Sequence, residues 1–182
     1  FSAKVGPDRF RDWIEAIPGG SEISLYLHVP FCRRLCWFCA CRTQGTATAT
    51  PVAAYVDSLK AELKSISDVL PQGVKIEHLH WGGGTPTFMS NDQMRALMAE
   101  TRKHFRFADD DEGEFSIEID PREASGDTVR LLREIGFNRM SLGVQDFDPK
   151  VQRAVNRIQS EEETMAVLEA ARAAGFRSIS IG

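Results

Sequence analysis

Short apolar runs recur along the chain, and segments with a different, helical spacing of apolar residues separate them. The runs are bounded by glycine, proline or charged residues, which is typical of strands buried in a sheet. Five strands are predicted in this way, over residues 23–29, 75–81, 114–119, 139–143 and 177–181.

The segments between the strands carry their apolar residues three or four positions apart. The first of them has a single apolar stripe, which predicts a helix of about four turns that faces the core. This stripe consists of Val52, Val56, Leu59, Leu63 and Ile66. A second helix is predicted to turn Met94, Leu97, Met98 and Phe105 inward, with the methionines filling gaps in the core.

Start and stop signals mark the ends of these helices. The sequences "SNDQ" at 90–93 and "SEEE" at 160–163 fit capping boxes, and "DP" at 148–149 places an N-cap before a proline at the first helical position. Gly136 and Gly175 stand where a helix should end and a strand begin. Strands and helices therefore alternate.

This alternation predicts an α/β fold with a parallel sheet and helices outside it. Ligands of such sheets bind beyond the carboxyl ends of the strands. The chemically distinctive segments all lie there. Four cysteines follow the first strand and "GGGTPT" follows the second, while Glu118 ends the third strand and Gln145 follows the fourth.

All four cysteines lie within "CRRLCWFCAC" at 32–41. Zinc sites usually draw two pairs of ligands from separate parts of the chain, although a zinc module with Cys41 as the fourth ligand stays an alternative. A thioredoxin-like dithiol would account for Cys36 and Cys39 alone. Three thiolates at Cys32, Cys36 and Cys39 suit an iron–sulfur cube with one iron left open, because ordinary clusters of this type take four cysteines.

The C-x3-C-x2-C spacing after the first strand, with an aromatic residue before the third cysteine, resembles the signature of the radical S-adenosylmethionine (SAM) enzymes. The resemblance implies a 4Fe-4S cluster on Cys32, Cys36 and Cys39, with SAM on the open iron. One electron from the cluster would split SAM and give a 5'-deoxyadenosyl radical. It also implies a partial (β/α)6 barrel, here truncated after the fifth strand, with residues 1–22 as a helical extension and 23–182 as the catalytic domain.

Longer segments resemble one family of radical SAM enzymes, the oxygen-independent coproporphyrinogen III oxidases. These segments are "LYLHVPFCRRLCWFCAC", "LHWGGGTPT", "SIEIDPRE", "GFNRMSLGVQDFD" and "VQRAVNR", in that order. The resemblance implies that the site holds two SAM molecules, and that one set of residues contacts them. That set is Tyr26, Phe38, Gly83, Gly84, Thr85, Glu118, Gln145 and Arg157. Thr85 replaces the glutamate that is usual in other radical SAM enzymes.

The implied reaction belongs to porphyrin and haem biosynthesis. It converts two propionates of coproporphyrinogen III to vinyl groups, with loss of carbon dioxide, and would need an electron donor such as a flavodoxin or ferredoxin. Arg33, Arg34 and Arg42 are candidate partners for the carboxylates of the tetrapyrrole. Cys41 marks this family and is a candidate catalytic residue, although a buried packing role would also suit a small thiol.

Two histidines lie on predicted strands near these segments. His28 shares a strand face with Tyr26, because side chains alternate along a strand, and could lie near the cluster or serve in packing. Of the pair His78 and His80, we expect at most His80 to face a pocket.

The composition of the chain limits the kinds of binding partner and the cellular location that we expect. The chain of 182 residues is 42% hydrophobic and 26% charged, with a net charge of -4, which argues against a general nucleic-acid binder. It has no run of the roughly 18 apolar residues that a membrane span needs and no signal-peptide pattern, so we expect a cytoplasmic protein. The first residue, Phe1, and the apolar end "SISIG" suggest a piece of a longer protein, and Gly182 stands where the resembled family has an aspartate.

Two alternatives remain within the superfamily. One is a haem-carrying relative that binds cluster and haem without oxidising coproporphyrinogen. The segments "CWFCAC" and "VNR" favour the oxidase, because carrier relatives generally lack the fourth cysteine and differ at the second segment. The other is a catalytically incomplete fragment of the oxidase.

Overall fold

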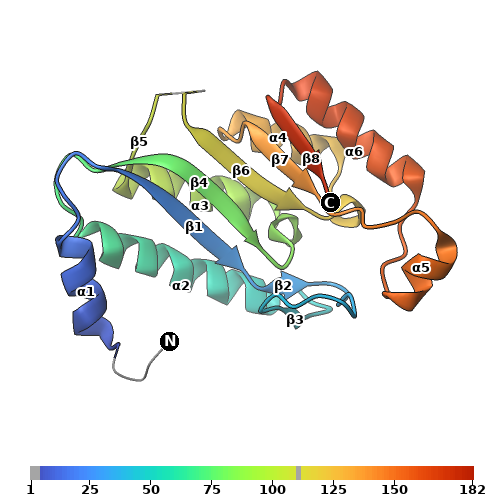
Figure 1. Ribbon diagram of the computed structural model, residues 1–182, viewed down its shortest axis with the longest axis horizontal. Helices are drawn as coiled ribbons and strands as arrows, with labels where there is room; N and C mark the ends of the chain where they lie inside the picture. The colour runs from blue at the N-terminus through green and yellow to red at the C-terminus, as the bar shows by residue number, and fades with distance from the viewer. Residues whose placement is uncertain (1–4, 110–111) are drawn as a thin grey trace.

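A parallel sheet forms the centre of the computed structural model, which describes residues 5–109 and 112–182. The strand order is β1-β4-β6-β7-β8, and β5 pairs with β4 (Figure 1). The bounds are β1 (Glu22–Val29), β4 (Lys75–Gly83), β5 (Arg106–Phe107), β6 (Glu114–Ile119), β7 (Arg139–Leu142) and β8 (Ser178–Ile181). All five predicted strands are present and every main pairing is parallel, so the predicted α/β partial barrel is confirmed.

The strands that sequence reasoning missed are two residues long. Besides β5 they are β2 (Phe31–Cys32) and β3 (Gln44–Gly45), which pair with each other beside the main sheet. Two residues show no alternation, so no periodicity could have revealed them. The pair β2–β3 matters because it begins and ends the segment that carries the cysteines.

Helices flank the strands, and in the view of Figure 1 the third and fourth lie behind the sheet, while the first and the fifth lie beyond its left and right ends. They are α1 (Pro7–Glu15), α2 (Thr50–Ser67), α3 (Asn91–His104), α4 (Gly126–Glu134), α5 (Pro149–Ala154) and α6 (Glu161–Ala174), with short 3-10 turns η1 (Pro86–Phe88) and η2 (Pro121–Glu123). In the part of the chain described, none of them combines the length and the apolar character needed to cross a membrane. Residues 1–4 of the expected N-terminal extension lie outside the described residues.

The predicted start and stop signals of the helices are present in the structure, as capping hydrogen bonds and as a glycine with positive φ. Ser90 and Gln93 form both halves of a capping box on α3, and Ser160 and Glu163 do the same on α6. The Asp148 carboxylate accepts a hydrogen bond from the amide of Lys150 at the start of α5. Gly175 ends α6 with a φ of 82°. Residues Val52, Val56, Leu59 and Leu63 of the α2 stripe are buried.

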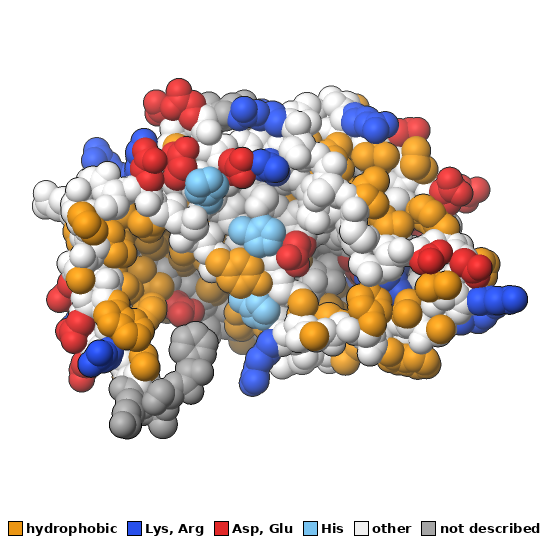
Figure 2. Space-filling model, in the orientation of Figure 1, with side chains coloured by type: hydrophobic (Ala, Val, Ile, Leu, Met, Phe, Trp, Pro, Cys, Tyr) orange, Lys and Arg blue, Asp and Glu red, His pale blue; other side chains and the backbone are white. Residues whose placement is uncertain are grey.

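The two faces of the sheet differ in chemistry because side chains alternate along each strand. One set points toward the helices and is buried, for example Leu79 and Trp81 of β4 and Ile117 of β6. The other set is polar and lies on the face that the helices leave uncovered. Histidine side chains gather near the middle of that face (Figure 2). The uncovered set comprises Tyr26, His28, His78, His80, Ser116, Glu118, Arg139 and Ser141.

The glycine run at the end of β4 is packed by the chain itself. A Cβ on Gly83, whose φ is +111°, would collide with the His28 ring. On Gly84 it would lie 2.7 Å from the carbonyl oxygen of Phe31, and the amide of Gly84 donates to the carbonyl of Val29 at 2.8 Å. The resemblance implies that Gly83 and Gly84 contact SAM. In the structure they first allow β4 to lie against the segment that follows β1.

We therefore expect Gly84→Ala to lower the free energy of unfolding by about 1–3 kcal/mol, the range for overpacking against atoms that cannot move cheaply. Chemical denaturation of this chain measures the change. Gly126→Ala is the matched control, because its Cβ would meet nothing closer than 3.6 Å at the start of α4. Equal stability of the two variants would contradict the packing argument.

Candidate functional site

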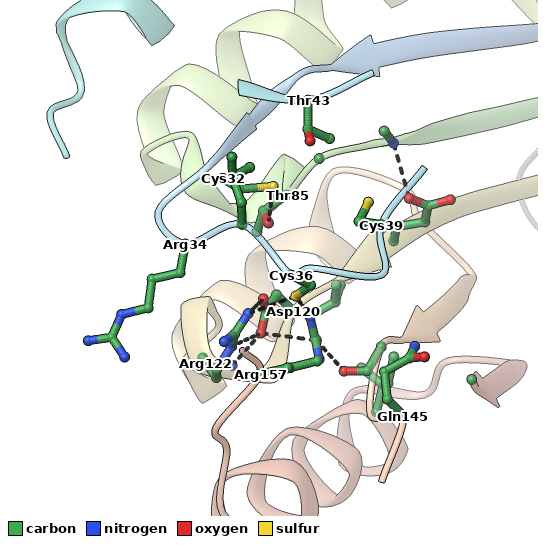
Figure 3. Close-up of a pocket in the computed structure, with 18 of the residues that line it drawn as sticks. Cys32, Arg34, Cys36, Cys39, Thr43, Thr85, Asp120, Arg122, Gln145 and Arg157 are labelled. Carbon is green, nitrogen blue, oxygen red and sulfur yellow. Dashed lines mark hydrogen bonds and ion pairs between the residues drawn. The ribbon is translucent and has the colours of Figure 1, made fainter. Parts of the chain in front are cut away.

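A cavity of about 250 Å³ opens at the carboxyl ends of β4, β6 and β7, where the sequence motifs were expected to meet. The cysteine segment forms one wall and the strand ends form the other (Figure 3). The chemically distinctive residues of its lining are Cys32, Cys36, Phe38, Cys39, Gly83, Gly84, Thr85, Glu118, Asp120, Arg122, Gln145, Arg157 and Gly182. The site therefore gathers residues from six separate segments.

The cysteines of the segment are all free thiols. Cys32 lies at the end of β2, where burial raises the pKa of its thiol and the Thr85 hydroxyl donates to its sulfur at 3.6 Å. Cys36 and Cys39 lie on one turn, closed by a hydrogen bond from the amide of Cys39 to the carbonyl of Cys36. The three sulfurs are distributed along the same cavity wall (Figure 3).

Residues after α5 hold this turn in place. The amide of Trp37 donates to the carbonyl of Val155 at 3.0 Å, and the side-chain amide of Asn156 donates to the carbonyl of Leu35 at 2.8 Å. Asn156 has a φ of 54°, a left-handed conformation that asparagine tolerates better than most residues. The position of the cysteines therefore depends on a segment about 120 residues further along the chain.

A buried charge cluster lies against Cys36. Asp120, at the start of η2, binds Arg122 through both carboxylate oxygens, at 2.9 Å and 2.6 Å, and lies 3.3 Å from Nη2 of Arg157. Arg157 also donates to the carbonyl of Gly143. Burial would raise the pKa of Asp120, but the two guanidinium groups outweigh it, so the pKa is lowered. The carboxylate is therefore ionised at neutral pH.

One donor of this cluster is unpaired. Nε of Arg157 is buried and has no hydrogen-bond partner among the described residues, whereas both of its terminal nitrogens are engaged. A buried guanidinium donor without a partner is unfavourable. A ligand with an anionic oxygen would satisfy it.

Glu118 faces the cavity from the end of β6. Its carboxylate accepts hydrogen bonds from Nε2 of His80 at 3.2 Å and from the amide of Gly83 at 3.0 Å. The hydrogen bond from His80 is the main reason that the pKa of Glu118 is lowered, against the effect of burial. The carboxylate is held as an acceptor, a suitable partner for ligand hydroxyls.

The aromatic side chains of β1 lie beside this carboxylate, outside the cavity lining. The Tyr26 ring stacks on His80 at 5.6 Å between centroids, and its hydroxyl bonds to Nδ1 of His28 at 3.0 Å. Nε2 of His28 lies 2.8 Å from the carbonyl of Arg42. Because a carbonyl only accepts, that nitrogen carries a proton. His28 thus bonds to the end of the cysteine segment, and His80 supports Glu118.

Gln145 and Gly182 meet at the opposite end of the cavity. The amides of Val144 and Gln145 both donate to the carbonyl of Gly182, at 2.7 Å and 2.8 Å. Gln145 has a φ of 70°, which turns the chain at the end of β7. Gly182 contributes only backbone at the position where an aspartate was expected.

Cys41 lies in a neighbouring hollow, which His28, Pro30, Arg42 and Tyr55 also line. The side chain is exposed, so the interpretation of Cys41 as a buried packing residue is wrong. The pKa of its thiol is raised, first by a hydrogen bond to Cys39 and then by burial. The fourth cysteine is thus close to the third but faces a different space.

The structure brings together most of the predicted site residues. Only Tyr26 and Cys41 lie outside the cavity lining. Tyr26 stacks on His80, which in turn bonds to Glu118 of the lining. Of the candidate arginines, Arg34 lines the cavity, Arg33 pairs with Glu123 at 2.9 Å, and Arg42 lies beside Cys41.

Sequence reasoning assigned no role to Asp120 and Arg122. Their position in "DPRE", directly after the third strand, was the available signal.

Comparison with known proteins agrees with the geometry. The sequence model of the Radical SAM superfamily matches residues 26–182. Oxygen-independent coproporphyrinogen III oxidases from Paracoccus denitrificans and Pseudomonas aeruginosa are 50% and 47% identical over 180 and 182 residues. Each alignment covers at least 99% of this chain and 40% of the relative, so the chain spans about two fifths of their length.

The solved structure of coproporphyrinogen III oxidase from Escherichia coli, which is described as a radical SAM enzyme, superposes with a TM-score of 0.92. The identity is 41%, and the match covers 100% of this chain and 41% of that one. The predicted resemblance is confirmed, and with it the cofactors of the superfamily, a 4Fe-4S cluster and SAM. Because the superfamily model matches most of its length, this chain belongs to the radical SAM superfamily.

Proposed function

We propose that this chain is the cluster- and SAM-binding part of an oxygen-independent coproporphyrinogen III oxidase. The observation that carries the proposal is the convergence of the three cysteines, the glycine loop, Glu118 and Arg157 on one cavity. Relatives of that name match it at 50% identity over almost its entire length. The reaction proposed is the conversion of two propionates of coproporphyrinogen III to vinyl groups. Each propionate loses one hydrogen atom to the 5'-deoxyadenosyl radical, then carbon dioxide, and one electron that passes to an external one-electron acceptor.

Cys32, Cys36 and Cys39 are the proposed ligands of the 4Fe-4S cluster. Their thiols suit it chemically, and donors from Thr85 and Arg157 already contact two of the sulfurs. A single zinc ion would need three or four donors converging on one point. In residues 5–109 and 112–182, no three histidine, cysteine or acidic side chains converge in that way. The zinc module stays the alternative that the cysteine variants test.

SAM is proposed to lie between the cysteine segment and the strand ends. Arg157 would pair with the methionine carboxylate, because its buried Nε lacks a partner. Glu118 would accept hydrogen bonds from the ribose hydroxyls. Bound there, the cluster and SAM supply a radical that abstracts hydrogen; the chain positions SAM and excludes water.

The remaining proposed contacts with SAM come from residues that line the walls of the cavity. Gly83, Gly84 and Thr85 offer backbone along one side, Phe38 an apolar face, and Gln145 an amide at the far end. Tyr26 stacks on His80 and would reach SAM from the strand side. A second SAM molecule, expected from the resemblance, stays a prediction.

The substrate is proposed to approach from the side of the cysteine segment. Arg34 is the best placed of the candidate arginines for a propionate, because it lines the cavity, whereas Glu123 already occupies Arg33. Cys41 is proposed as a catalytic residue at the substrate side. A flavodoxin or ferredoxin in the cytoplasm is the proposed electron donor.

Alanine variants test the ligand set. After anaerobic reconstitution with iron and sulfide, we expect Cys32→Ala, Cys36→Ala and Cys39→Ala each to lose the cluster absorption and the bound iron, because two thiolates hold it too weakly. Cys41→Ala should keep both. Iron lost from Cys41→Ala, or tight zinc in place of the cluster in the unaltered chain, would show that the ligand assignment is wrong.

A chimera tests the reaction. The matched 180 residues of the Paracoccus denitrificans relative are replaced by this sequence, and the protein is incubated anaerobically with reductant, SAM and coproporphyrinogen III. We expect 5'-deoxyadenosine and vinyl product, and neither from the same chimera with Cys36→Ala. Deoxyadenosine without vinyl product would overturn the oxidase proposal, and haem binding in its place would favour the haem-carrying alternative.

A further inference from the structure

The buried charge cluster against Cys36 consists of Asp120, Arg122 and Arg157, and SAM binding does not require all three residues. Arg157 alone offers the unpaired donor for a carboxylate. Arg122 is turned to Asp120 through two side-chain hydrogen bonds, and the amide of Arg122 also donates to Asp120 at 3.1 Å. The side chains of Asp120 and Arg122 are only 9% and 14% exposed. Burying an ion pair is costly, so this pair needs an explanation beyond stability.

Both arginines point at the same sulfur. Nη1 of Arg157 lies 3.4 Å from Sγ of Cys36, and Nη2 of Arg122 lies 4.0 Å from it (Figure 3). Asp120 lies between the two guanidinium groups and fixes both. Two positive charges and one negative charge leave a net charge of +1 beside one proposed cluster ligand.

Positive charge and N–H donors near a cluster sulfur stabilise the reduced cluster, which carries one more negative charge. The effect is strong where water is excluded, because the local dielectric constant is low. Reduction adds one electron from an external one-electron donor to the 2+ cluster and gives the 1+ cluster, with no bond made or broken in the protein.

We propose that Arg122 and Asp120 are positioning residues that set the reduction potential of the cluster through Cys36, Arg122 raising it and Asp120 limiting the rise. This inference rests on the proposed function in one respect, the assignment of Cys36 as a cluster ligand. It gives Arg122 a role distinct from that of Arg157, which also serves SAM.

The test is the midpoint potential of the reconstituted chain, measured without SAM by an EPR-monitored titration with dithionite. Arg122→Gln keeps a hydrogen-bond donor and removes the charge. We expect reduction to become on the order of tenfold less favourable, which is about 59 mV for one electron. Asp120→Asn should shift the potential in the opposite direction, and Arg122→Lys should stay closest to the unaltered chain.

Arg95→Gln is the matched control. It also removes one positive charge, but from a surface pair with Glu134 on the outer helices, so the potential should not move. Iron content and the visible spectrum of each variant show whether the cluster is intact.

Opposite shifts in the two principal variants support the proposal, because a merely structural role would move both potentials in one direction. Shifts in the same direction, or shifts no larger than that of Arg95→Gln, would overturn it. If one variant holds no iron, the direction in which the midpoint potential of the other variant shifts decides whether the proposal stands. If neither holds iron, the pair acts in assembly and the proposal is wrong. Absence of a cluster from the unaltered chain would instead count against the proposed function.

Discussion

The alternation of side chains along four parallel strands is the constraint on which the rest of the structure depends. Successive residues of a strand point to opposite faces. For this reason β4 buries Leu79 against the helices and presents His80 on the other face. In the same way β6 buries Ile117 and presents Glu118. A slip of one residue would exchange the two sets. The register that secures the core is therefore also the register that assembles the polar face.

The carboxyl ends of these strands convert that face into a site. The chain leaves β1 into the cysteine segment, leaves β4 through the glycine run, and leaves β6 into Asp120 and Arg122. Each of these exits is hydrogen-bonded to another. The amide of Gly84 donates to Val29 at the end of β1, and the amide of Thr85 donates to Phe31 just after it. The amide of Gly83 donates to Glu118. The cavity is thus held by backbone hydrogen bonds between loops, with the side chains of Arg157 and Asn156 closing it from outside.

Much of this arrangement could be predicted from the sequence, because its signals are local. Apolar runs, capping boxes and the spacing of Cys32, Cys36 and Cys39 each lie within a few neighbouring residues. What could not be predicted depends on distant partners. Nothing near Arg122 shows that it points at Cys36, and nothing near Gly84 shows that Phe31 occupies the space beside it. The exposure of Cys41 was missed for the same reason, since its surroundings come from β1 and α2.

The contacts between the cysteine turn and the segment after α5 also order events during synthesis. Leu35, Cys36 and Trp37 are each contacted by one residue of the segment Val155, Asn156 and Arg157. A ribosome adding about 5–20 residues per second needs roughly 6–24 s to make the intervening stretch. Throughout that interval the thiols lie on a segment without its final supports. The finished arrangement of the thiols therefore exists only after the last of these residues has emerged.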